Sequence, residues 1–415
     1  MNTIKWYDWM QYAAMLLMAA AMPIAWRLGL LAAVILAGTS FVKLVIERRV
    51  PNPALDKPLR WAMWLALVYL LCCLVSVFYS SDTAVAWEVM GRKVVLLIFP
   101  LCFLLTDTGY LNTRRMRNLG YALLFSMVGV FLFFACKALI DVSHGATWTR
   151  VTSLAFDRRH HAYTSLYAVT ALVFVYNELR LHWSEMKGWL RGVMIASTAM
   201  VILYTMLVNS RAGFLSLVVA AVCCVLHLAL HHHRVKAALV VGILVTAEII
   251  GASFLPGHTN RFEGTVVDAT RVDADTRIQI YVSSTHAAKK QLLFGYGVGD
   301  YRSDLWEMYC EDEFLDGINH RLNAHNQYFE TLLSVGLVGL TVMMLWLLIP
   351  LWIAWRRCHR CFFEIALLTS IVLFNMLFES MLERQMGLLF IAYLIPIMVL
   401  ILSMQENKFG RTEKN

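Results

Sequence analysis

The chain has 415 residues, of which 59% are hydrophobic and only 15% are charged, and its mean hydropathy is +0.61. Soluble globular proteins average about 45–50% apolar and about 25% charged residues, so the composition excludes an ordinary soluble domain. The formal net charge is +8. In a chain this apolar we interpret the basic excess as a topology signal, and we expect no nucleic-acid partner.

Apolar stretches long enough to cross the hydrocarbon core of a bilayer, about 20 residues as a helix, recur along nearly the whole chain. They predict an all-α, multi-pass integral membrane protein with about twelve transmembrane helices. We expect no cleavable signal peptide, because the first apolar run lacks a small-residue cleavage site. The predicted spans are residues 10–25, 28–46, 61–79, 93–106, 118–140, 161–179, 189–208, 212–231, 235–254, 326–354, 363–380 and 386–404.

The cysteines argue against disulfides and give only a weak sign of a metal site. Most of them lie inside the predicted spans, and Cys310 is the one that lies in a long polar segment. Cys358 and Cys361 form a CxxC group without a second pair, which is a weak metal signal. We therefore expect no disulfide, no bound metal and no cofactor.

The basic residues predict how the chain is oriented. More than half of the 36 Lys and Arg residues lie in connections on the side of the N-terminus, where cytoplasmic connections retain them. Both chain ends are therefore predicted to face the cytoplasm, and the long polar segment is predicted to lie outside. The predicted organisation is transmembrane helices one to nine in 1–254, a loop domain in 255–325, three further helices in 326–404 and a cytoplasmic tail in 405–415.

Some basic residues remain on the predicted outer side, where membrane insertion disfavours them. Arg27 and Lys137 flank spans and can reach the interface by snorkelling. Arg211 differs, because in "LVNSRAGFLSL" it occupies a short turn between two predicted spans. A guanidinium group binds phosphate through a bidentate fork, so Arg211 is consistent with a phosphate ligand and equally with a topology role.

Residues 255–325 are too polar to span a membrane and too long for an idle connection, which indicates a functional cap. Within it, "TRIQIYVSSTHAAKKQLLFG" predicts an amphipathic helix that starts at Arg277, ends before Gly295 and lies against the membrane or the bundle. The following "FGYGVGDY" is interpreted as glycine turns, since it follows a helix and a nucleotide site needs a strand. The apolar positions at helical spacing are Ile278, Tyr281, Val282, Thr285, Ala288 and Leu292.

"NAHNQYFETLLSVGLVGL", residues 323–340, places His325 and Asn326 immediately before an apolar span. A histidine at this position is often a neighbour of a helix cap or a packed interface residue. Its helix also begins on the outer side, where the unexpected arginines lie. A neutral imidazole with a pKa near 6.5 can take a proton from a sugar hydroxyl, so a general base is the second interpretation.

Taken together, "RAGFL" and "HNQYFETLLSVGLVG" resemble the motifs of the O-antigen ligase and polymerase superfamily. The first fits the ligases' pattern of arginine, three residues and leucine, beginning at Arg211. The second fits histidine, a small amide or hydroxyl residue, nine residues, glycine, two residues and a small residue. His325, Asn326, Gly336 and Gly339 occupy those positions. "LLFGYGVGDY" resembles the family's glycine-rich stretch, and these motifs together cover about residues 205–340.

The resemblance implies an integral-membrane glycosyltransferase of the GT-C type in the inner membrane of a Gram-negative bacterium, with its active site on the periplasmic side. The implied donor is a glycan on undecaprenyl diphosphate, and the implied acceptor is a sugar hydroxyl of lipid A–core. Transfer would invert the anomeric centre without a metal or a nucleotide sugar. His325 would act as general base, while Arg211 and Arg277 would bind the diphosphate and stabilise the leaving group.

Further residues are predicted to line the same site. Four outer basic residues would extend the diphosphate cluster, and Asn326 would contact substrate. His161 opens a predicted span from the outer side, which is also typical of packing at a helix end. Glu379 and Glu383 are predicted to share one helix face, where one of them would orient His325 or pair with Arg384. The four basic residues are Arg92, Lys93, Arg158 and Arg159.

Two alternatives to the ligase remain open. A polymerase of the same superfamily would join repeat units on the lipid carrier, and the single large outer loop with both ligase-type motifs favours the ligase only modestly. A transporter of lipid-linked glycans belongs to a different class. Transporters often contain paired broken helices in two related halves, and the sequence has no such symmetry.

Overall fold

The computed structural model describes residues 5–48, 51–147, 161–208, 210–231 and 274–412, with a few single residues between 239 and 246. These residues form helices and contain no strand, as the composition predicts. The helices are α1 (Trp6–Ile24), α2 (Trp26–Glu47), α3 (Lys57–Val77), α4 (Thr83–Lys93), α5 (Val95–Leu105), α6 (Thr113–Ser143), α8 (His161–His182), α9 (Gly188–Leu207), α10 (Arg211–His231), α13 (Ala274–Lys290), α14 (Tyr301–Glu311), α15 (Leu315–His320), α16 (Gln327–Arg357), α17 (His359–Met376) and α18 (Gln385–Thr412).

Seven of the described helices are long and apolar enough to cross a membrane, so the chain is a multi-pass membrane protein. The predicted spans fall on described helices, except 235–254, which lies largely outside the described residues. α5 has only 11 residues, or about 16 Å of helix, against a hydrocarbon core of about 30 Å. The total of twelve spans stays a prediction. The crossing helices are α2, α3, α6, α9, α10, α16 and α18.

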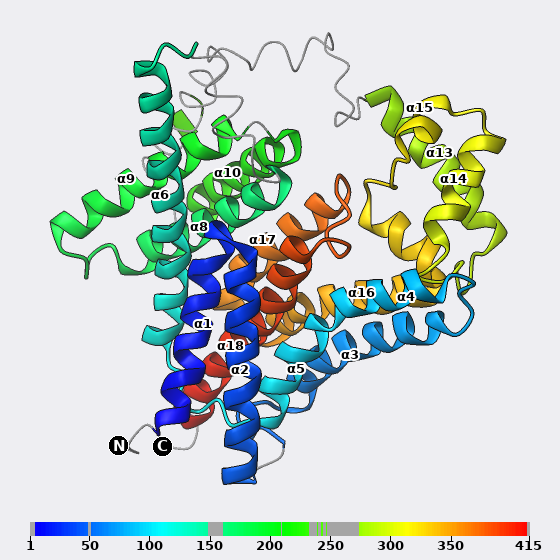
Figure 1. The fold of residues 1–415 in the computed structure, drawn as a ribbon. Helices are drawn as coiled ribbons and strands as arrows, with labels where there is room; N and C mark the ends of the chain where they lie inside the picture. The colour runs from blue at the N-terminus through cyan, green and yellow to red at the C-terminus, as the bar shows by residue number, and fades with distance from the viewer. Residues whose placement is uncertain are drawn as a thin grey trace.

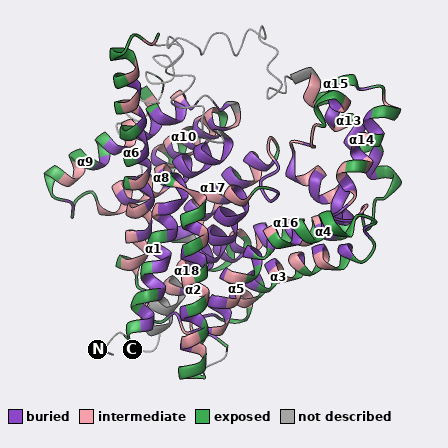
Figure 2. Cartoon of the chain, in the orientation of Figure 1, coloured by how far each residue is buried: buried purple, intermediate pink, exposed green. Residues whose placement is uncertain are grey.

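α18 is the centre of the helical bundle. In its most apolar window 89% of the residues are buried, against 33–44% in the other crossing helices. It packs against α2, α3, α5, α16 and α17. α1 begins and α18 ends at the same end of the bundle, while α13, α14 and α15 lie at the other side of the molecule (Figure 1). Figure 2 shows the purple, buried residues concentrated where these helices meet.

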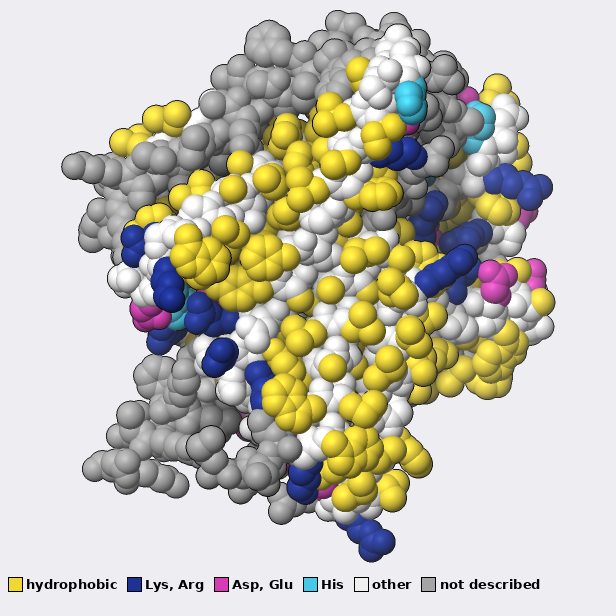
Figure 3. All heavy atoms as spheres, turned by 60° about the vertical axis from the view of Figure 1, so that its left-hand side comes forward, with side chains coloured by type: hydrophobic (Ala, Val, Ile, Leu, Met, Phe, Trp, Pro, Cys, Tyr) yellow, Lys and Arg dark blue, Asp and Glu magenta, His cyan; other side chains and the backbone are white. Residues whose placement is uncertain are grey.

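The outer surface of the bundle is apolar, as contact with lipid requires. Figure 3 shows a broad hydrophobic surface with the basic side chains towards its margins. Exposed tryptophans lie near helix ends, including Trp6 and Trp9 on α1 and Trp352 and Trp355 on α16. Tryptophan is enriched at the membrane–water boundary, where its ring is apolar and its N–H can be hydrated. These residues mark one interface of the bundle.

The described part of the long loop folds into a cap with its own small core. α13, α14 and α15 pack on one another and on the start of α16 around Ile280, Tyr301, Leu305 and Tyr309. The predicted helix after residue 276 is therefore confirmed as α13.

The apolar face predicted for α13 is buried in the protein only in part, since Ala288 is 4% exposed. Ile278 and Val282 are 60% and 47% exposed, whereas Ser283, Ser284 and Ala287 are buried. Small side chains let α13 approach its neighbours closely, and the larger apolar ones point outward. Helical spacing alone could not distinguish these two faces.

The glycine-rich stretch after α13 binds the backbone of α16 directly. α16 is broken at Gly336, where φ is +68° and ψ is −169°. The freed α16 carbonyl groups of Leu333 and Ser334 accept hydrogen bonds from Tyr296 N (2.7 Å) and Gly297 N (2.9 Å). A Cβ at position 336 would lie 2.2 Å from the backbone oxygen of Leu293. The interpretation as glycine turns is confirmed, and Gly336 permits the close approach.

The cysteine prediction is wrong at one pair. Cys358 and Cys361 form a disulfide where α16 ends and α17 begins. The CxxC spacing brings their Cα atoms to 5.7 Å, a separation that suits a disulfide. Seven other cysteines are free.

Candidate functional site

His325 lies in a tight turn between the cap and α16. Asn326, and not His325, caps the helix, because its Oδ1 accepts hydrogen bonds from Tyr328 N (2.9 Å) and Phe329 N (3.3 Å). His325 has φ +44°, in the left-handed region that costs a non-glycine residue on the order of 1 kcal/mol or more. The turn therefore keeps the histidine in a strained conformation.

The imidazole of His325 is neutral at ordinary pH. Its buried Nδ1 has no hydrogen-bond partner among the described residues. Burial lowers the pKa of His325 to about 4, and the positive charges of Arg277 and Arg384 act in the same direction. A neutral imidazole with a free nitrogen can accept a proton, so the second sequence interpretation is chemically feasible.

Arg277 reaches this turn from the first turns of α13. Its Nη1 donates a hydrogen bond to the carbonyl oxygen of Phe378 (3.2 Å), and its guanidinium lies 5.8 Å from the centre of that ring. Phe378 belongs to the connection between α17 and α18. Arg277 therefore links the cap to the loop that carries Glu379 and Arg384.

Glu379 and Glu383 do not share a helix face, because α17 ends at Met376 and residues 377–384 form turns. The prediction of one helical face is wrong, and the short span between the two helices explains why. No hydrogen bond joins Glu379 to His325 in the described structure. Burial raises the pKa of Glu379, while Arg384 and Arg277 oppose that change. Glu379 thus lies within the electrostatic reach of both arginines that act on His325.

Arg384 is the residue that sequence reasoning undervalued. It is exposed and makes no ion pair with any described residue, although it acts on both His325 and Glu379. The sequence contained a signal for it. Arg384 is a basic residue on the predicted outer side, as Arg211 is, and only its possible pairing with a glutamate was considered.

Arg211 begins α10, capped by Ser210, whose Oγ accepts a hydrogen bond from Gly213 N (3.1 Å). Further along α10, Ser216 Oγ accepts a hydrogen bond from Asn375 Nδ2 (2.9 Å), immediately before residues 377–384. Five residues of helix rise about 7 Å, so the backbone of Arg211 lies near that loop.

His161 begins α8 at the same end of the bundle. Two residues on, Tyr163 OH donates a hydrogen bond to Ser380 O (3.4 Å). The side chains of Arg211 and His161 are not described, and Arg158 and Arg159 lie outside the described residues.

Two of the predicted substrate ligands pair with carboxylates of the protein itself. Lys93 is buried and pairs with Glu383 Oε1 at 2.7 Å, while Tyr301 OH donates a hydrogen bond to Glu383 Oε2 at 3.1 Å. Arg92 pairs with Glu88 at 2.9 Å on the exposed side of α4. The contacts of Glu383 with Lys93 and Tyr301 join α4, α14 and the 377–384 loop. The sequence alone did not indicate that Glu383 is the partner of Lys93.

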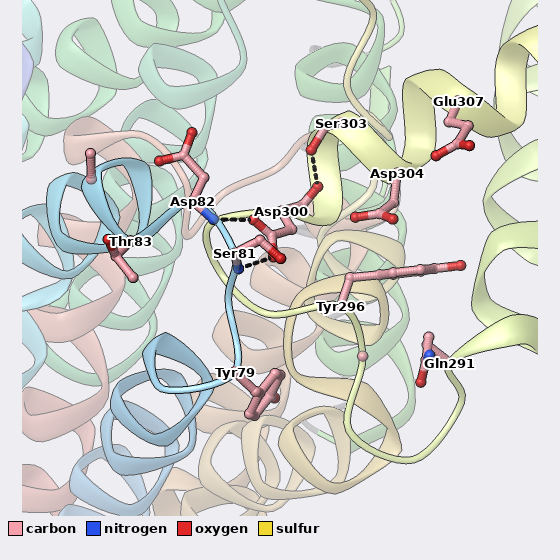
Figure 4. Close-up of a pocket in the computed structure, with 12 residues that line it drawn as sticks. Tyr79, Ser81, Asp82, Thr83, Gln291, Tyr296, Asp300, Ser303, Asp304 and Glu307 are labelled. Atoms are coloured by element: carbon pink, nitrogen blue, oxygen red, sulfur yellow. Dashed lines mark hydrogen bonds between the residues drawn. The ribbon is translucent and has the colours of Figure 1, made fainter.

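A cavity of about 860 Å³ lies apart from these residues, between the start of α4 and the cap (Figure 4). Its walls include Asp82, Asp300, Asp304 and Glu307, together with Tyr79. Asp300 accepts hydrogen bonds from the backbone N–H groups of residues 81 and 82 and so holds the two sides together (Figure 4). Four carboxylates would repel a diphosphate, so this cavity is not the anion site.

One comparison with known proteins gave a match. Residues 195–344 match a family model described as O-antigen ligase. This segment belongs to the O-antigen ligase family. It contains α10, the cap helices and the first half of α16, and therefore includes Arg211, Arg277 and His325. A comparison with curated proteins found no match. The O-antigen ligase segment supports a role of the chain in joining O-antigen polysaccharide, as a glycosyltransferase-like enzyme.

Proposed function

We propose that the chain transfers O-antigen glycan from undecaprenyl diphosphate to a sugar hydroxyl of lipid A–core. The enzyme would be of the GT-C type, in the inner membrane, with both chain ends cytoplasmic and the site facing the periplasm. It would use no metal. His325 would be the general base, and Arg211, Arg277 and Arg384 would bind the diphosphate.

One observation carries this proposal: the free nitrogen of a neutral histidine lies within the field of two arginines at one end of the bundle. Glycosyl transfer needs both kinds of group within one substrate length. A base must meet the acceptor hydroxyl, and positive charge must meet the diphosphate leaving group. The O-antigen ligase segment supports the same assignment, because it contains His325 and Arg277.

The proposed reaction breaks one bond and forms one. His325 takes the proton of the acceptor hydroxyl as its oxygen attacks the anomeric carbon from the face opposite the diphosphate. The bond between that carbon and the diphosphate oxygen breaks, and undecaprenyl diphosphate leaves. Arginine charge stabilises the leaving oxygen, which is the role that a metal ion plays in other transferases.

Diphosphate binding would also strengthen the base. Burial keeps the pKa of His325 low, and the positive charge of Arg277 and Arg384 lowers it further. An anionic donor would offset the charge of Arg277 and Arg384, so the pKa of His325 would rise towards its ordinary value of about 6.5. The imidazole would become a better base only when the donor is in place.

The test is reconstitution of the purified protein with carrier-linked glycan and lipid A–core, with product measured by gel shift. His325→Ala should abolish transfer while expression and thermal unfolding stay near wild type. His286→Ala is the matched control, because His286 is exposed on α13 and pairs with Asp312 at 3.0 Å. Wild-type transfer activity in His325→Ala would refute the role of His325 as general base.

The same assay separates the alternatives. A polymerase would lengthen carrier-linked glycan without lipid A–core, whereas a ligase would make product only when that acceptor is present. A transporter would move the lipid across the bilayer of a proteoliposome and form no glycosidic bond. Product that depends on acceptor therefore supports the ligase alone.

A further inference from the structure

Glu330 occupies an unusual position, one turn inside α16 and fully buried. Its Oε1 accepts two hydrogen bonds from outside its own helix. One comes from the backbone N–H of Ala324 (3.1 Å), the residue immediately before His325. The other comes from Ser380 Oγ (3.0 Å), which lies in the loop between Glu379 and Arg384.

These two bonds join the two segments that make up the candidate site. The turn at 323–326 carries the histidine, and the loop 377–384 carries Glu379 and Arg384 and accepts the hydrogen bond from Arg277. A second contact holds the same pair of segments, since Leu382 N donates to Gln327 Oε1 at 2.6 Å. Among the described residues that join these two segments, Glu330 alone also binds the backbone of the histidine turn, through Ala324 N.

The backbone at His325 needs such support. Its φ of +44° is unfavourable for a histidine, and the strain persists only when the surroundings hold the turn. Asn326 secures the downstream side of the turn by capping α16. The bond from Ala324 N to Glu330 secures the upstream side.

We propose that Glu330 is a positioning residue that sets the distance and orientation of His325 relative to Arg384. It acts through hydrogen bonds to both loops, without touching substrate. This inference rests on the proposed function for its catalytic consequence, but its structural content can be measured separately.

Glu330→Ala removes both bonds, whereas Glu330→Gln keeps an Oε1 acceptor in the same place. A misplacement of about 1 Å can cost about 10²-fold in rate, so Glu330→Ala should lower kcat by about that factor. Glu330→Gln should retain activity within a few-fold. In Glu330→Ala the acidic limb of the kcat/KM profile should also move to higher pH, because a released imidazole regains water.

Hydrogen–deuterium exchange supplies the readout that is independent of activity. Glu330→Ala should speed exchange in peptides that contain Ala324 and His325, and Glu330→Gln should not. Ser334→Ala is the matched control, one turn along the same helix. Ser334 is also buried, and its Oγ donates only to Thr331 O within α16. It should leave exchange and the pH profile unchanged.

Two results would overturn the inference. Equal losses in Glu330→Gln and Glu330→Ala would assign the effect to the carboxylate charge, and unchanged exchange at Ala324 would show that Glu330 does not hold the turn. Failure of the wild type to transfer glycan would instead refute the proposed function, and exchange would still decide whether Glu330 positions the turn.

Discussion

Arg384→Gln tests whether guanidinium charge controls the basicity of His325. The pKa of His325 is lowered from 6.5 to about 4, which corresponds to ~3 kcal/mol against protonation. Burial is the largest cause and Arg277 the second, so removal of Arg384 should recover a minority of this energy. As the smallest of three causes, Arg384 supplies less than a third of the shift, so we expect roughly half a pH unit, or about 0.7 kcal/mol.

The assay is the pH dependence of kcat/KM, which reports the free enzyme. Transfer needs the unprotonated imidazole, so activity is lost as pH falls through the pKa of His325. In Arg384→Gln the acidic limb should therefore move upward by roughly half a pH unit. Lys290→Gln is the control of equal charge change, because Lys290 is exposed and pairs with Glu311 at 2.7 Å. An unchanged limb in Arg384→Gln, or an equal movement in Lys290→Gln, would refute the reasoning.

Three other predictions test the remaining parts of the site. Arg211→Lys should lose most transfer activity, because a point charge cannot reproduce the bidentate fork, and wild-type rates would leave Arg211 a topology role only. EDTA should leave turnover unchanged, whereas a loss that magnesium restores would contradict the metal-free mechanism. Gly336→Ala should lower the unfolding temperature measurably, because its Cβ would meet the Leu293 carbonyl oxygen at 2.2 Å. An unchanged unfolding temperature would show that the contact between α16 and the glycine-rich stretch tolerates a side chain.

The membrane class and most helices could be predicted because lipid leaves long apolar runs in the sequence. The helix α13 and the glycine turns were also recoverable from periodicity and from glycine spacing. Which residues of α13 pack on the protein could not be predicted, since Ala288 is buried whereas Ile278 and Val282 at the same helical spacing are exposed. In a membrane protein an exposed apolar side chain carries no penalty when its neighbour is lipid, so hydropathy loses its power to distinguish inside from outside.

The site was only partly predictable for a related reason. His325, Arg277 and Arg211 stood out as polar residues beside apolar spans, and the structure places His325 and Arg277 within electrostatic reach of one another. The partner of Lys93 could not be found, because Glu383 lies far along the chain and pairs with it only after α4 meets the 377–384 loop. Glu330 was hidden in the same way, since its two partners are loop groups brought together by folding.

The described basic residues near the site differ in whether they are neutralised. Lys93 is buried and balanced by Glu383, and Arg302 lies 3.8 Å from the same carboxylate. Both cations share this one carboxylate, and Lys93 makes the shorter contact. Among the described residues, Arg277 and Arg384 both act on Glu379, and burial raises the pKa of Glu379, which weakens its compensating charge. Arg277 and Arg384 therefore leave positive charge beside His325, where an arriving diphosphate would be held and would raise the pKa of the imidazole.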